Sequence, residues 1–281
     1  MGTRGTGKAG GGVAESRPVS EPIIRVRGLR AEYGERLVLD GIDLDVSRGE
    51  ILVILGGSGC GKSTLLKHMI GLYEPARGTI EIEGRSLVDA EGVDRRSILR
   101  GIGVTYQSGA LFGSMTLLEN VRLAMGEATD LPVDAQEWIG RLKLRLVGLE
   151  DFVHHYPSEL SGGMRKRAAI ARALALDPPI LFLDEPSAGL DPVTSAELDS
   201  LILRLRDTLG VTFVVVTHEL ASIFAIADRV VMLDKDKKKI VATGTPEKLR
   251  DHCEIDFVRR FFRREAGPTT TETPNAPETD R

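Results

Sequence analysis

Several features that define other classes of protein are scarce in this sequence. It holds two cysteines, Cys60 and Cys253, which are far apart and form neither a disulfide framework nor a metal-binding spacing, so we expect free thiols. No apolar run approaches the roughly 20 residues that a membrane-spanning helix requires, and the first residues contain no apolar signal segment. We therefore expect a chain that stays in the cytoplasm.

Positive charge is not in excess either. Lys and Arg number 37 against 41 Asp and Glu, which gives a net charge of −4. A nucleic-acid-binding protein usually carries a broad basic surface, so this balance argues against nucleic acid as a partner. Of the 281 residues 42% are hydrophobic, which is enough for a buried core in one large α/β domain or two small ones.

The composition changes along the chain and divides it. Residues 1–20 are rich in Gly, Ser, Arg and Pro, and residues 266–281 are rich in Thr, Pro and Glu, so both tails are expected to be disordered. The sequence between the tails predicts one domain over residues 21–250. A short helical extension over residues 251–265 is predicted to follow it.

Two patterns of apolar residues predict two kinds of sheet. Three early segments alternate apolar and polar side chains between glycine turns, which is typical of an antiparallel lobe; these are residues 23–33, 37–46 and 78–84. Three later segments are short apolar runs that alternate with helical patterns, which predicts a buried parallel sheet; these are residues 180–184, 212–216 and 229–234.

The segment between these two groups of strands has a different pattern. Over residues 108–160 the apolar side chains recur at helical intervals, so we expect a helical subdomain. The spacing of its second helix predicts one apolar face, formed by Trp138, Leu142, Leu146 and Leu149.

A glycine loop lies between the apolar run 51–55 and a helical pattern, and this context predicts a phosphate-binding loop. Glycine permits positive φ and close approach of the backbone to a ligand. The loop N–H groups and the start of the helix would hold phosphate, Lys62 would reach the outer phosphates, and Ser63 would bind Mg²⁺. The alternative is a glycine-rich turn without a ligand. The predicted nucleotide-binding residues here are Gly56, Gly57, Ser58, Gly59, Cys60, Gly61, Lys62, Ser63 and Thr64.

Two adjacent acids, Asp184 and Glu185, end the apolar run 180–184. Ligands of such sheets bind at the carboxyl ends of the strands. Asp184 would hold Mg²⁺, and Glu185 would act as general base towards the water that attacks the γ-phosphate. A solvated acidic turn is the alternative.

A second glycine loop, LSGGM at residues 160–164, precedes another helical pattern and predicts a second anion site. With this motif the chain resembles the ATP-binding subunit of an ABC transporter over about residues 23–250. The resemblance includes, in order, Tyr33, the phosphate loop, Gln107, LSGG, the acidic strand end, SAGLD at residues 187–191, and Thr217-His218. It implies a P-loop NTPase fold, ATP and Mg²⁺ as cofactors, and hydrolysis coupled to transport.

The resemblance also implies residue roles. Tyr33 would stack on adenine, Gln107 would contact Mg²⁺ and the water while it senses the membrane subunit, and His218 would bond the γ-phosphate. Their alternatives are a half-buried strand residue, a strand cap and a core histidine. Two copies of the chain would pair head to tail, each closing over the ATP of the other through Ser161, Gly162 and Gly163, with Asp191 coupling the two sites.

One departure from the common pattern and one further segment indicate a branch of the family. Met164 replaces the usual glutamine after LSGG, and residues 106–121 read YQSGALFGSMTLLENV. Both are similar to the ATPase of Mla-type lipid transport systems, whose permease works with MCE-domain proteins. This implies a phospholipid or other hydrophobic cargo and a place on the cytoplasmic face of the inner membrane. Another ABC importer or exporter branch, or a pair that remodels the cell envelope without transport, remains the alternative.

Two further expectations concern the cysteines and the C-terminal extension. Cys60, beside a helix N-terminus and Lys62, is expected to be a reactive thiolate, with Cys253 as the competing thiol. Residues 256–265 place four apolar side chains opposite four arginines on a short helix, which needs a surface to bury its apolar side. That surface is the core of the chain, the paired ATPase or anionic lipid; we favour the paired ATPase over lipid, and the hypothesis is that residues beyond Asp251 strengthen pairing of the two ATPases.

Overall fold

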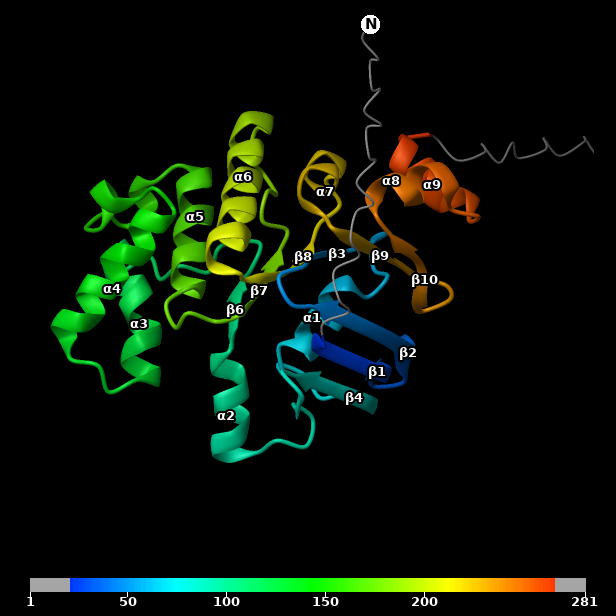
Figure 1. Ribbon diagram of the computed structural model, residues 1–281, viewed down its shortest axis with the longest axis horizontal. Helices are drawn as coiled ribbons and strands as arrows, with labels where there is room; N and C mark the ends of the chain where they lie inside the picture. The colour runs from blue at the N-terminus through cyan, green and yellow to red at the C-terminus, as the bar shows by residue number, and fades with distance from the viewer. Residues whose placement is uncertain (1–20, 266–281) are drawn as a thin grey trace, which may run out of the picture.

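The computed structural model describes residues 21–265 and consists of two sheets with helices around them (Figure 1). The predicted disordered tails, 1–20 and 266–281, lie outside the described residues. Within residues 21–265, no helix has the length and apolar character needed to cross a membrane.

The first sheet is antiparallel, with strand order β2-β1-β4-β5. Alternation builds it, because Val26 of β1 faces Leu44 on one neighbour and Ile80 on the other, and all three side chains are buried. Its strands are β1 (Pro22–Tyr33), β2 (Arg36–Ser47), β4 (Arg77–Ile82) and β5 (Arg85–Ser86). The predicted antiparallel lobe is confirmed.

The second sheet forms the centre of the molecule, with strand order β10-β9-β3-β8-β7-β6. The pairs from β9 to β6 are parallel, as the apolar runs predict, and β10 adds an antiparallel edge that these runs do not predict. The strands are β3 (Ile51–Gly56), β6 (Ile102–Thr105), β7 (Ile180–Asp184), β8 (Thr212–Val216), β9 (Arg229–Asp234) and β10 (Lys239–Gly244).

The central sheet is buried on both faces and separates two hydrophobic clusters. On β3, Ile51 and Val53 pack with the helices that follow residue 116, whereas Leu52 and Ile54 pack with the antiparallel sheet and α1. Residues of β8 divide in the same way. Period-two alternation therefore assigns neighbouring side chains of one strand to different cores.

Helices cover the sheets in groups that Figure 1 separates clearly. Helices α3, α4 and α5 form one end of the molecule, α6 to α9 follow along one side of the central sheet, and α2 lies apart from them. The helices are α1 (Lys62–Met69), α2 (Gly92–Arg100), α3 (Leu117–Ala128), α4 (Val133–Leu146), α5 (Gly162–Ala173), α6 (Pro192–Leu209), α7 (Leu220–Ile226), α8 (Pro246–His252) and α9 (Asp256–Arg263). Short 3₁₀ turns cover Glu150–Phe152 and Pro157–Glu159.

The buried face of α4 differs from the prediction. Trp138 is 67% exposed, and Leu142 and Leu146 are half-buried, while only Leu149 of the predicted face is buried. The buried residues of α4 are Gln136, Gly140, Lys143 and Leu144. The helix turns its small and polar residues inward because α3 approaches it closely: a β-carbon on Gly140 would lie 2.7 Å from Leu118 Cδ1.

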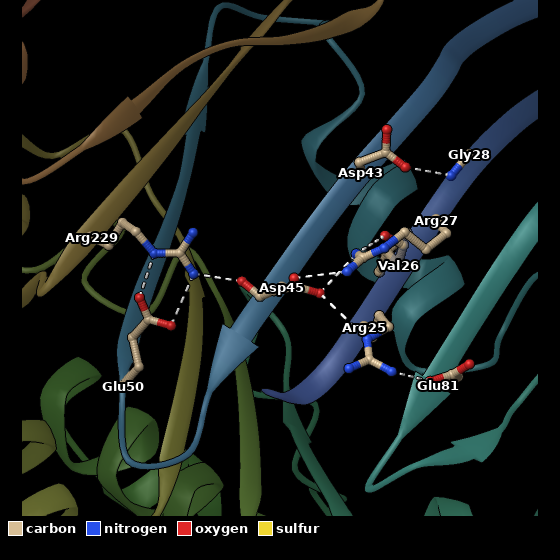
Figure 2. A network of polar contacts seen from close by, with 9 residues as sticks. All are labelled: Arg25, Val26, Arg27, Gly28, Asp43, Asp45, Glu50, Glu81 and Arg229. Carbon is tan, nitrogen blue, oxygen red and sulfur yellow. Dashed lines mark hydrogen bonds and ion pairs between the residues drawn. The ribbon is translucent and has the colours of Figure 1, made fainter. Parts of the chain in front are cut away.

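A polar network ties the antiparallel sheet to the central sheet (Figure 2). Arg229 of β9 donates to both carboxylate oxygens of Glu50, at 2.6 and 3.0 Å, and to the main-chain oxygen of Asp45 on β2. The Asp45 carboxylate in turn pairs with Arg27 of β1. These bonds raise the pKa of Arg229 and, through Arg27, lower that of Asp45. The network fixes β2 and β1 relative to the strand pair β9 and β3.

The Arg229→Met variant is expected to lower the free energy of unfolding by about 2–3 kcal/mol, because the Glu50 side chain, only 10% exposed, would lose its charged partner and keep the bond from the Ser47 N–H. Arg25→Met is the matched control, since the Arg25–Glu81 pair of the same network is 43% and 34% exposed and such pairs contribute less than about 1 kcal/mol. Urea denaturation measures both. Equal losses of unfolding free energy in the two variants would show that the Arg229–Glu50 pair contributes no more than an exposed ion pair.

The C-terminal helices pack on the core of the chain itself. Val258 and Phe262 of α9 are buried in the cluster that includes the central sheet, and the Phe262 ring meets Phe224 of α7 edge to face, with 6.0 Å between centroids. Phe257 is 37% exposed, and with the half-buried Phe261 it borders a surface groove. Two of the four apolar residues of α9 are therefore buried in the core of the chain. The other two remain at the surface.

Candidate active site

The glycine loop connects β3 to α1, with its first residue still in the strand. φ is 153° at Gly56, 74° at Gly59 and 102° at Gly61, a region that favours glycine. At Gly56 space is limiting as well, since a β-carbon would lie 2.5 Å from Cys60 Sγ and 2.6 Å from the carbonyl oxygen of Leu233. The loop has the backbone that the sequence predicts for holding phosphate.

Lys62 begins α1 and folds back over the loop. Its Nζ donates to the carbonyl oxygens of Gly56, at 2.8 Å, and of Gly57, at 3.2 Å. An ammonium in this position lies where the loop would surround an anion. Bound phosphate oxygens would compete with these carbonyls for the ammonium.

A cleft opens beside the loop towards Tyr33, at the end of β1. The Tyr33 ring is supported edge to face by Tyr73, with centroids 5.7 Å apart, and Lys67 lies over the Tyr73 ring. The residues that line the cleft are Tyr33, Arg36, Val38, Gly59, Gly61, Lys62, Ser63 and Thr64. Sequence reasoning missed Arg36 and Tyr73; a basic residue closely following Tyr33 was the available signal for Arg36.

The acidic pair ends β7, one strand away from β8 and two from β3. Asp184 is half-buried, and its pKa is raised first by burial and then by the charge of Glu185, against the opposing effect of Lys67 and Lys62. A cation near this carboxylate would favour its charged form.

The oxygen atoms available at this end of the sheet fit Mg²⁺. The Ser63 hydroxyl, the Asp184 carboxylate and the Gln107 side-chain amide are all hard oxygen donors, which this ion prefers. In the part of the chain that the structure describes, no group of three or more His, Cys, Asp or Glu side chains is placed to hold a metal. Few protein ligands are typical of magnesium that is shared with nucleotide phosphates.

Glu185 and His218 meet although 33 positions separate them. The Nδ1 atom of His218 lies 2.8 Å from Glu185 Oε1; the histidine side chain is 70% exposed and that of the glutamate 14%. The parallel register of β7 and β8 pairs Asp184 with Val216, so the residues that follow these strands are neighbours. Gln107 follows β6, the next strand of the same sheet, and is exposed.

The LSGG loop lies at the start of α5. Ser161 is the N-cap, and its Oγ accepts from the Met164 N–H. Gly163 approaches α6 so closely that a β-carbon would lie 2.4 Å from Thr194 Cγ2, which explains a glycine there. Asp191 caps α6 and accepts from Val193 and Thr194. These residues are part of neither the lining of the Tyr33 cleft nor the Glu185–His218 pair.

Cys60 corrects an expectation. Its side chain is 1% exposed, and burial raises the pKa of the thiol, outweighing the opposite effect of Lys62. The prediction of a reactive thiolate is wrong, because the loop turns Cys60 into the hydrophobic cluster beneath α1.

Brief treatment of the folded protein with iodoacetamide is therefore expected to label Cys253, which is partly exposed, well before Cys60. Peptide mass spectrometry after quenching measures both. The matched control is the same treatment in denaturant, where the two thiols are expected to react alike. Preferential labelling of Cys60 in the native protein would contradict this burial.

The glycine loop between β3 and α1, together with the acidic end of β7, defines a P-loop nucleotide-binding protein of the α/β class. The sequence profile of the ABC transporter family matches residues 39–188. MlaF of Haemophilus influenzae, the ATP-binding protein of an intermembrane phospholipid transport system, is 36% identical over 256 residues, which are 91% of this chain and 96% of that protein. The chain belongs to the ABC transporter family as an ATP-binding subunit.

Other relatives and structures agree with this family. The probable ribonucleotide transport ATP-binding protein mkl of Mycobacterium leprae is 40% identical over 246 residues, 87% of this chain and 70% of that protein. A dimeric post-hydrolysis structure of the ATP-binding cassette MJ0796 bound to ADP and Pi superposes with a TM-score of 0.71 at 31% identity, covering 79% of this chain and 98% of that chain. The predicted fold class is thus confirmed, and the chain is an ABC-type ATPase.

Proposed function

We propose that this chain is the ATP-hydrolysing subunit of a phospholipid transport system of the Mla type. The similarity to MlaF, which extends over nearly the whole of that protein, carries the proposal. LSGGM and residues 106–121 support it. The subunit would work on the cytoplasmic face of the inner membrane with permease subunits and an MCE-domain protein.

The residues divide the work of hydrolysis as follows. Tyr33 stacks on adenine, and the phosphate loop with Lys62 holds the β- and γ-phosphates. Glu185 accepts a proton from the attacking water, and His218, already 2.8 Å from it, bonds the γ-phosphate. Mg²⁺, held by Ser63, Asp184 and Gln107, would neutralise phosphate charge.

The second half of each site comes from another copy of the chain. Ser161, Gly162 and Gly163 close over the nucleotide of the partner, with the main-chain N–H groups at the start of α5 directed at phosphate. Asp191, which caps α6, links this surface to the neighbouring site. The dimeric form of the MJ0796 structure supports such pairing.

The cargo is tested by reconstitution. The chain, purified with the membrane subunits that accompany it, is placed in vesicles containing a fluorescent phospholipid, and ATP-dependent transfer to acceptor vesicles or to a lipid-binding subunit is measured. Transfer by the wild type and none by Glu185→Gln supports the proposal. ATP-dependent uptake of ribonucleotide without lipid transfer would instead favour the branch of mkl. ATP hydrolysis without any cargo would favour envelope remodelling.

The exposed part of α9 is proposed to contact the paired ATPase. Phe257 and Phe261 border a groove that continues to Gly57 and Ser58 of the phosphate loop, next to the surface that the partner would cover. The Phe257→Ser/Phe261→Ser variant is expected to pair less in ATP, because its apolar contact is lost, while Val258 and Phe262 keep the helix in place.

Light scattering of Glu185→Gln backgrounds with ATP measures this pairing. Trp138→Ser is the matched control, since Trp138 is an exposed aromatic residue on α4. Undiminished pairing of the double serine variant would exclude a dimer contact for α9.

A further inference from the structure

One lysine outside the predicted site connects two of its strands. Lys166 lies in the second turn of α5, and its Nζ donates to the carbonyl oxygen of Gln107 at 2.6 Å and to that of Glu185 at 3.1 Å. Gln107 follows β6 and Glu185 follows β7. A single ammonium therefore joins the helix that follows LSGG to the ends of both strands.

The bonds from Lys166 are formed in a partly dry place. The side chain is half-buried, and burial lowers the pKa of its ammonium, while the carboxylates of Glu185 and Asp184 act in the opposite direction. Hydrogen bonds from a charged donor are roughly twice as strong as neutral ones. The two bonds from the Lys166 ammonium to these carbonyls are therefore expected to be strong.

The main chain at Glu185 needs such support. Its φ is 49°, in the left-handed region that residues with a β-carbon seldom adopt. The Glu185 N–H donates to the Val216 carbonyl at 2.8 Å, and the Glu185 carbonyl accepts from Ala188 N–H at 3.2 Å as well as from Lys166. This conformation directs the carboxylate towards His218, so a shift of the main chain would move the base.

The same helix holds the Gln107 segment at a second point. Arg172, two turns further along α5, donates to the carbonyls of Ala110 at 2.6 Å and Gly109 at 3.5 Å. Arg172 thus bonds only to the Gln107 segment, whereas Lys166 bonds to both that segment and the Glu185 main chain. Variants of the two residues therefore separate an effect on the segment from an effect on Glu185.

We propose that Lys166 is a positioning residue that fixes the Glu185 main chain to the Gln107 segment and to α5. The inference rests on the roles proposed above for Glu185 and Gln107. Because α5 begins at the LSGG loop, closure of that loop on the ATP of the partner is transmitted through Lys166 to the general base of its own site. In this proposal the N-terminus of α5 contacts the ATP bound by the partner, and Lys166 of the same helix positions the base for the ATP bound by its own chain.

Steady-state ATP hydrolysis by the full-length chain tests this role. Lys166→Met is expected to lower kcat on the order of 10²-fold, the cost of a catalytic group displaced by about 1 Å, with no change in the Kd for ATP. It is also expected to abolish cooperativity in ATP. Arg172→Met, the matched control, loosens only the Gln107 segment and does not touch the Glu185 main chain, so it should lower kcat much less. Equal losses of kcat in both variants would overturn the proposal.

A double variant separates positioning from general damage. If Lys166 acts through Glu185, Lys166→Met adds no further loss of kcat to Glu185→Gln, measured in single turnovers with radiolabelled ATP. Losses that multiply would overturn the proposal. If Lys166→Met does not fold, Lys166→Gln keeps one neutral donor and is expected to have intermediate kcat; wild-type kcat in that variant would overturn the proposal. If Glu185→Gln hydrolyses ATP slowly but Lys166→Met has the kcat of the wild type, the role of Lys166 is excluded and the proposed function is not affected.

Discussion

The Glu185→Gln variant is expected to bind ATP as tightly as the wild type but to hydrolyse it 10² to 10⁴ times more slowly, about the contribution of a positioned general base. The amide has nearly the shape of the carboxylate but cannot accept the proton of the attacking water. The bond to His218 is kept in altered form, because an amide oxygen still accepts from Nδ1. Phosphate release from the purified chain, with ATP affinity measured in parallel, gives the two quantities.

Two observations complete this test. If ATP holds the proposed pair together and hydrolysis opens it, Glu185→Gln should remain dimeric in ATP where the wild type does not. Glu137→Gln is a matched control that removes an exposed carboxylate on α4, where it pairs with Arg141, and should leave the rate unchanged. A Glu185→Gln protein that turns over at the wild-type rate would refute the assignment of the general base.

The second large effect is expected in binding. Lys62→Ala removes the ammonium that now bonds the Gly56 and Gly57 carbonyls and would bond the outer phosphates of ATP. Charged hydrogen bonds contribute about 1.5–3 kcal/mol each, so the Kd for ATP should rise by about 10- to 100-fold. Equilibrium binding of a fluorescent ATP analogue measures the change, with AMP as a ligand that should be affected much less.

Lys239→Ala is the matched control for charge, since Lys239 is exposed on the edge strand β10. It should bind ATP normally. If Lys62→Ala also binds ATP normally and keeps the wild-type rate, the loop does not hold the outer phosphates and the phosphate-loop assignment fails.

Sequence patterns predicted the features that depend on residues close together in the chain. The phosphate loop could be recognised because strand, glycines, lysine and helix follow one another in the sequence, and the structure gives Gly56, Gly59 and Gly61 the expected positive φ. The two sheets were predictable because alternating and continuous apolar runs report how many faces of a strand are buried. The pairing of Glu185 with His218 was not, since it depends on the register of β7 and β8.

The errors arose where tertiary packing overrides a pattern. On α4, the large apolar Trp138 is exposed, whereas Gly140 and Lys143 face inward, because close approach of α3 favours a glycine and Lys143 reaches Asp177 from a buried position. At Cys60 the sequence showed the positive surroundings but not the depth of the side chain, which decides the pKa. Lys166 gave no signal, because its two acceptors are main-chain oxygens.

The two hydrophobic clusters on either side of the central sheet imply two units of local stability. The cleft beside the phosphate loop is lined by residues of β1, β2, the loop and α1, and these segments pack in the unit that contains the antiparallel sheet, while α3 to α9 pack in the other. Proteins open in such cooperative units, each with its own free energy. A ligand binds only when the unit that forms its site is folded. At a concentration of 100 times its Kd it therefore stabilises that unit by about 2.7 kcal/mol. Nucleotide should therefore slow amide hydrogen exchange mainly on one face of the sheet, and leave the helical face free to fluctuate until a partner covers it.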